Sequence, residues 1–141
     1  MSASFSLHPQ LTKDTHNLFI HKNIHITLHK NATIPWIILV PITARTEIYH
    51  LSAETTRILT QLYTDIGLYF SQRFNTEKMN IAAIGNIVQQ LHIHVIGRKP
   101  DDACWPGVVW GSNYPIKAYT SGQLQSIKND LKGLITQINT P

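Results

Sequence analysis

The chain has 141 residues, of which 43% are hydrophobic and 14% charged, and its formal net charge is +4. A chain of this length matches one ordinary domain, and its apolar content suffices for a core, which excludes a disordered protein. Lysines and arginines are spread along the chain, so we expect no nucleic-acid-binding arm.

Three strands are predicted in the first third of the chain. Residues 24–29 alternate strictly between aliphatic and polar side chains, which is typical of a half-buried strand. Residues 18–21 are expected to form its hairpin partner. Residues 35–41 form an apolar run bounded by two prolines, which predicts a central strand.

Two helices are predicted from apolar side chains at steps of three and four. The first begins after Ser52, a suitable N-cap, and ends near residues 74–76. The second covers residues 120–138 and is capped by Thr120 or Ser121. Each helix carries one apolar stripe, so each is expected to pack against the sheet.

The rest of the chain adds two strands, at residues 79–84 and 91–96, and an irregular segment at 100–114 that is rich in Pro, Gly and Trp. This order predicts an α+β fold with a mainly antiparallel sheet of about five strands, packed by a long central helix and a C-terminal helix. Because no linker or repeat interrupts the sequence, residues 1–141 are expected to form one domain.

Cysteine content and hydropathy indicate the cellular compartment in which the protein is expected. Cys104 is the one cysteine, which excludes an intrachain disulfide and a Cys-rich zinc site. The N-terminus lacks the features of a secretory signal. The longest apolar run, residues 36–40, is far shorter than the roughly 20 residues that span a bilayer. We therefore expect a cytoplasmic protein with no membrane partner.

Residues 90–94, Gln-Leu-His-Ile-His, are the strongest candidate for a functional site. Alternate residues of a strand share a face, so Gln90, His92 and His94 are predicted to project together, away from the core. A neutral imidazole is a nucleophile or base near pH 7. Three interpretations are open: a solvated strand face, a His-x-His metal site completed by a distant histidine, and a covalent catalytic site.

The remaining histidines have no motif around them and are expected to lie on the surface. They are His8, His16, His21, His25, His29 and His50. Arg98 follows the predicted strand and is interpreted as a surface residue or a phosphate ligand.

The segment 90–98 resembles the signature of the histidine triad (HIT) superfamily, in which three histidines alternate with apolar residues, with Gln90 in place of the first histidine. The likeness covers about residues 5–110. Its flanking matches are Met79–Ile81, Gly85–Val88, Trp36–Pro41 and Trp105–Pro106.

The resemblance implies a covalent mechanism. His92 would attack the α-phosphorus of a nucleotide, and water would then hydrolyse the nucleotidyl-histidine. His94 would hydrogen-bond the phosphate oxygens. The main-chain amides of the loop Gly85, Asn86, Ile87 and Val88 would hold these oxygens as well.

The resemblance also implies further substrate contacts. Asn80 and Asn86 are candidate polar contacts, and Asn31 loosely matches the position that meets the ribose. Trp105 would line the base or leaving-group side, or else anchor its own loop by packing.

Three positions depart from the family pattern. Gln90 forms hydrogen bonds but does not titrate, so it cannot protonate a leaving group. Ile87 stands where many members carry Ser or Thr, and Trp36 stands where some carry another histidine.

The resemblance therefore implies a hydrolase or nucleotidyl transferase that cleaves a phosphoanhydride or phosphoramidate at the α-phosphate. It implies no required cofactor, although magnesium would accompany a polyphosphate substrate, and it implies a homodimer. Two alternatives stay open: a non-catalytic nucleotide sensor on the same fold, and a His-x-His metal-binding protein.

Overall fold

A computed structural model describes residues 4–138, with side chains up to residue 135. The ends of the expected 1–141 domain and the side chain of Ile138 lie outside this range. The elements are α1 (Pro9–Asp14), β1 (Thr15–His21), β2 (Ile24–His29), β3 (Trp36–Pro41), the 3-10 turn η1 (Ile48–His50), α2 (Ala53–Phe74), β4 (Lys78–Ala82), β5 (Ile93–Arg98) and α3 (Ser121–Ile138).

The five strands form one sheet in the order β1-β2-β3-β5-β4, and every neighbouring pair is antiparallel. The predicted α+β class is therefore confirmed. The first hairpin closes through Lys22 and Asn23, whose φ angles are 45° and 63°. Two central residues with positive φ match the twist of the flanking strands, which explains the tight connection.

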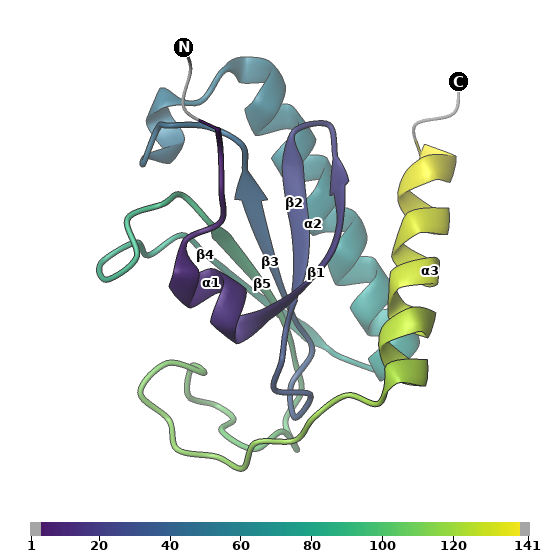
Figure 1. Cartoon of the computed structure of the whole chain (residues 1–141). Helices are drawn as coiled ribbons and strands as arrows, with labels where there is room; N and C mark the ends of the chain where they lie inside the picture. The colour runs from purple at the N-terminus through teal and green to yellow at the C-terminus, as the bar shows by residue number, and fades with distance from the viewer. Residues whose placement is uncertain (1–3, 139–141) are drawn as a thin grey trace.

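Both faces of the central strands β3 and β5 are covered (Figure 1). On one face, Ile37 and Val95 pack in the same cluster as Phe70 of α2 and Leu131 of α3. On the other face, a second cluster contains Trp36, Ile38 and Ile96 together with Leu11 of α1 and Val109 of the 99–120 segment. Burial on both faces explains why these strands are apolar runs.

The predicted ends of α2 and α3 are confirmed. The Ser52 hydroxyl accepts a hydrogen bond from the N–H of Thr55 at 3.1 Å, and Asn75 ends the helix in the left-handed conformation. Thr120 and Gln123 exchange side-chain to main-chain hydrogen bonds at the start of α3, which is a capping box. No helix within residues 4–138 is long and apolar enough to cross a membrane.

Several strand boundaries differ from the prediction, among them the end of β5, which lies at Arg98 and not at Ile96. β1 begins at Thr15 and not at Leu18, β4 ends at Ala82 and not at Ile84, and β5 begins at Ile93 and not at Leu91. The residues between β4 and β5 leave the sheet as a loop, although their apolar side chains resemble a strand. The short helices α1 and η1 were not predicted, because fewer than two helical turns produce no periodic pattern.

Arg98 is not a surface residue. The whole residue is 1% exposed, and its Nε and Nη2 atoms donate to Asp102 at 2.6 and 3.0 Å. Nη1 donates to Oδ1 of Asn80 at 2.9 Å, and Nη2 lies 3.4 Å from Sγ of Cys104. The guanidinium therefore ties β4 and β5 to the segment that follows them.

Candidate active site

His92 and His94 lie side by side at the start of β5. Their side chains are 7% and 6% exposed, and their ring centroids are 4.9 Å apart. Both border a cavity of about 590 Å³ on the sheet face opposite α2. The cavity is lined by Gln10, Leu11, Asp14, His29, Trp36, Ile38, Ile84, Gly85, Asn86, Ile87, Val88, His92, His94 and Trp110.

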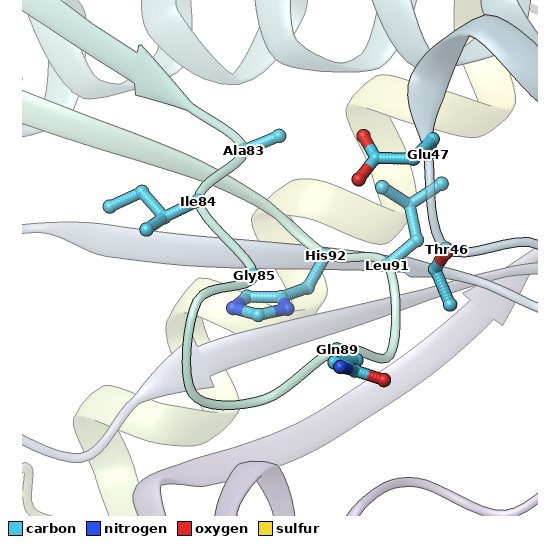
Figure 2. Close-up of a pocket in the computed structure, with 8 residues that line it drawn as sticks. All are labelled: Thr46, Glu47, Ala83, Ile84, Gly85, Gln89, Leu91 and His92. Atoms are coloured by element: carbon cyan, nitrogen blue, oxygen red, sulfur yellow. The ribbon is translucent and has the colours of Figure 1, made fainter.

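His92 is oriented by the main chain just before it. Its Nδ1 atom lies 2.7 Å from the carbonyl oxygen of Gln90. A carbonyl only accepts hydrogen bonds, so Nδ1 carries the proton and Nε2 keeps its lone pair. The same ring borders a second, polar pocket of about 200 Å³, where Figure 2 shows it beside Gly85 and across from Thr46 and Glu47.

Nδ1 of His94 accepts a hydrogen bond, whereas Nδ1 of His92 donates one. Nε1 of Trp36 donates to Nδ1 of His94 at 3.0 Å, because the indole nitrogen can only donate. Burial, reinforced by the neighbouring His92 and His29, lowers the pKa of His94 to about 3. The ring is therefore neutral near pH 7 and carries its proton on Nε2.

His29 was expected on the surface and instead belongs to this site. Its ring stacks on Trp36 with centroids 4.1 Å apart, and its Nδ1 accepts from the N–H of Asn31 at 3.1 Å. Burial lowers the pKa of His29, although Asp14 opposes that shift. The alternation of residues 24–29 contained the signal. In the antiparallel register of β2 and β3, Leu28 pairs with Ile37, which brings the next residue, His29, beside Trp36.

The loop 85–88, a candidate phosphate-binding segment, borders the cavity. Gly85 has a φ of 68°, a conformation that favours glycine, and it lines both pockets. Within the described residues, the main-chain N–H groups of residues 85–88 donate no hydrogen bond. Ile87 is 94% exposed, so its side chain packs against little of the protein and leaves the main-chain N–H groups of the loop open to a ligand.

Gln90 does not project into the cavity with the two histidines, because its side chain is bound to the N-terminal segment. Its Oε1 accepts from the N–H of His8 at 2.8 Å, and its Nε2 donates to the carbonyl of Ser6 at 2.9 Å. The side chain is committed to the N-terminal segment, and the carbonyl is the part that serves His92.

Three predicted contacts lie away from the cavity lining. Asn80 binds Arg98, and Asn31 joins its own turn to the main chain of Pro115 and Lys117. Trp105 lies under the Arg98 guanidinium, 5.8 Å from the ring centroid. These positions hold the scaffold around the site.

Trp110 occupies the place at the cavity that Trp105 was expected to hold. Its ring meets His94 edge-on at 4.9 Å and Trp36 at 5.8 Å. No sequence motif marked this residue, since it lies within the predicted irregular segment 100–114, which has no regular spacing. Within residues 4–138, no three His, Cys, Asp or Glu side chains are arranged to hold a metal ion.

Together, the fold and site define an α+β protein with two complementary imidazoles at the start of a central strand, facing a cavity. The HIT domain family model matches residues 10–101. The chain belongs to the HIT domain family. No curated protein matches its sequence.

Solved structures agree with this membership. A histidine triad protein from Marinobacter aquaeolei VT8 is 39% identical, with a TM-score of 0.84 over 96% of this chain and 98% of that one. The histidine triad protein blr8122 from Bradyrhizobium japonicum is 32% identical, with a TM-score of 0.84 over 94% and 99%. The diadenosine triphosphate hydrolase of Plasmodium falciparum is 19% identical, with a TM-score of 0.60 over 89% and 78%, and shares the fold.

Proposed function

We propose that the protein cleaves or transfers a nucleoside monophosphoryl group at the α-phosphate, through a covalent intermediate on His92. The observation that carries this proposal is the 2.7 Å contact between Nδ1 of His92 and the Gln90 carbonyl. That contact makes Nε2 the nucleophilic nitrogen and directs the ring toward the cavity. A hydrolase of diadenosine triphosphate among the proteins of this fold agrees with a nucleotide substrate.

The chemistry has two steps. In the first, the Nε2 lone pair of His92 bonds to phosphorus, and the bond from phosphorus to the leaving group breaks with its electron pair. The resulting imidazolium keeps its Nδ1 proton, which the Gln90 carbonyl stabilises. In the second step, water attacks the phosphorus and gives up a proton to solvent. The P–N bond breaks with its electron pair returning to Nε2, which releases the nucleoside monophosphate and neutral His92.

Phosphate binding is assigned to neutral donors. Within the described residues, neither cavity is lined by lysine or arginine. The free N–H groups of the 85–88 loop and the Nε2–H of His94 supply the hydrogen bonds to the non-bridging oxygens. These steps require no metal, and magnesium would enter as a chelate of a polyphosphate substrate.

Intact mass measurement tests the proposal. The protein is incubated with diadenosine triphosphate, quenched with neutral denaturant, and weighed. A mass increase of one adenylyl group in the wild type, absent in His92→Ala, is expected. His50→Ala is the matched control, because this exposed histidine borders neither cavity and should leave the adduct intact.

Other outcomes would point to the alternatives. Saturable nucleotide binding without adduct or turnover indicates a sensor. Stoichiometric bound metal that is lost in both His92→Ala and His94→Ala indicates a His-x-His metal protein.

We also infer a homodimer that forms along β4. This strand is one of the two edges of the sheet, and pairing is one way in which proteins protect such an edge. Ile81 on this strand is 42% exposed and borders an apolar hollow of about 240 Å³ beside α2. Light scattering should give twice the chain mass for the wild type and a monomer for Ile81→Lys, whereas a monomeric wild type would contradict the inference.

A further inference from the structure

Trp36 makes a contact with His94 that the nucleotidyl transfer itself does not require. It is 7% exposed at the start of β3, and its Nε1 atom lies 3.0 Å from Nδ1 of His94. The register pairs Ile38 with His94, so Trp36 and His94 are diagonal neighbours on one sheet face. The indole is itself held between His29, stacked on one face, and Trp110, which meets it edge-on.

The contact restricts His94 to one protonation state. An indole N–H cannot accept a hydrogen bond, so a proton on Nδ1 would place two donors 3.0 Å apart in a buried position. That penalty excludes both the imidazolium and the neutral form with its proton on Nδ1. Within residues 4–138, Nε2 of His94 makes no hydrogen bond, and no buried side-chain nitrogen lacks a partner, so Nε2 must reach the open cavity.

We propose that Trp36 is a positioning residue that holds His94 as a neutral donor at Nε2, so that the site releases leaving groups as stable anions. The first half stands on the hydrogen bond alone. The second half rests on the nucleotidyl transfer proposed above and names its substrate class.

Among the residues that the structure describes, no other group around the two cavities is placed to supply a proton to the leaving group. The titratable groups that line them, besides His94, are His92, His29, Asp14 and Glu47. His92 is the nucleophile, and His29 is held by a main-chain N–H at its Nδ1, as His94 is by Trp36. The two carboxylates accept hydrogen bonds, and Gln90, which does not titrate, is bound to the N-terminal segment.

This arrangement selects the leaving group by its stability as an anion. The P–N bond to His92 forms while the bond to the leaving group breaks, and the electron pair departs without a proton. Phosphate, carboxylate and aryl oxide groups leave in this way. An alkylamine does not, because its nitrogen must be protonated first, and general acids contribute about 10²–10⁴-fold to such steps.

Nitrogen NMR of ¹⁵N-histidine-labelled wild type tests the first half without any substrate. We expect His94, assigned by its absence in His94→Asn, to show an unprotonated Nδ1 and a protonated Nε2 that do not change between pH 5 and pH 8. A protonated Nδ1, or titration within that range, would overturn the assignment. Because the wild type alone decides this, the result does not depend on the folding of a variant.

Two Trp→Phe variants separate the hydrogen bond from packing. Trp36→Phe removes the donor and keeps a ring, so His94 should begin to titrate. We expect kcat to fall about 10- to 100-fold, by analogy with the loss of the hydrogen-bond partner of a metal-binding histidine. Trp110→Phe changes an aromatic contact with His94 that includes no hydrogen bond. It should keep the wild-type nitrogen signature whatever it does to activity.

Two AMP derivatives test the second half, one with p-nitrophenol and one with n-propylamine as the leaving group. We expect the wild type to cleave the aryl ester at least about 100-fold faster. Trp36→Phe should narrow this ratio, because a freed His94 can carry a proton. Equal rates in a wild type that still forms the His92 adduct would overturn the leaving-group inference alone, whereas the absence of any adduct would remove both that inference and the proposed function.

Discussion

The side-chain oxygen of Gln90 accepts a hydrogen bond from the main-chain N–H of His8 at 2.8 Å, across 82 positions of sequence. The same residue holds Nδ1 of His92 through its own carbonyl. The position that the family pattern gives to the first histidine thus serves two segments at once. Its side chain anchors the N-terminal segment, and its main-chain carbonyl orients His92, the proposed nucleophile.

Gln90→Ala should therefore affect stability more than chemistry. The loss of two half-exposed hydrogen bonds, to His8 and Ser6, should lower the free energy of unfolding by about 1–2 kcal/mol. The carbonyl is unchanged, so the His92 adduct should persist. Urea unfolding and intact mass measure the two effects, with the exposed Gln72→Ala as control. Loss of the adduct in a folded Gln90→Ala would give the side chain a role in the reaction.

The depressed pKa of His94 predicts a pH-dependent stability. The unfolded chain takes up a proton at this histidine near pH 6.5, whereas the folded chain does so at about pH 3. Stability from this group is thus fully present above pH 6.5 and is lost as the pH falls toward 3, by about 1.4 kcal/mol per pH unit. His94→Asn keeps an acceptor for Trp36 but does not titrate, so its unfolding free energy should fall less between pH 6 and pH 4. Parallel curves for the two proteins would contradict this prediction.

Removal of one partner of the Arg98–Asp102 ion pair should strongly lower the free energy of unfolding. Their side chains are 2% and 4% exposed, so Asp102→Asn leaves a buried cation without its carboxylate and should cost about 3–5 kcal/mol. Asp101→Asn is the matched control, because that neighbouring carboxylate is exposed. Urea unfolding at pH 7 compares them, and a difference below about 1 kcal/mol would argue against a structural role for the pair.

Substitution of two glycines by alanine should change the stability of the protein in opposite directions. A Cβ on Gly97 would lie 2.7 Å from Cγ2 of Thr76 and 3.0 Å from the Phe70 ring, so Gly97→Ala should destabilise by about 1–3 kcal/mol. A Cβ on Gly133, in the middle of α3, would meet nothing within 4 Å. Gly133→Ala should stabilise by about 0.5–1 kcal/mol through helix propensity. Thermal unfolding of both variants measures the signs.

Much of the fold could be predicted from local patterns. The period of residues 24–29, the aliphatic run at 35–41 and the stripe behind Ser52 report which face of each segment is buried, and the structure confirms all three elements. Local patterns fail in residues 83–92. The aliphatic side chains of Ile84 and Leu91 predict strands, although the main chain there has left the sheet.

The sequence by itself determined the five strands and the two long helices, the family, and the adjacency of His92 and His94, since all three follow from residue types at short spacing. Only the tertiary structure decided which nitrogen of each imidazole carries the proton. The Gln90 carbonyl accepts from Nδ1 of His92, and the indole of Trp36, 58 positions away from His94, donates to Nδ1 of that ring. It also brought His29 and Trp110 to the cavity and buried Arg98. Hydrogen bonds and burial depend on which distant segments pack together, and periodicity along the chain contains no record of those partners.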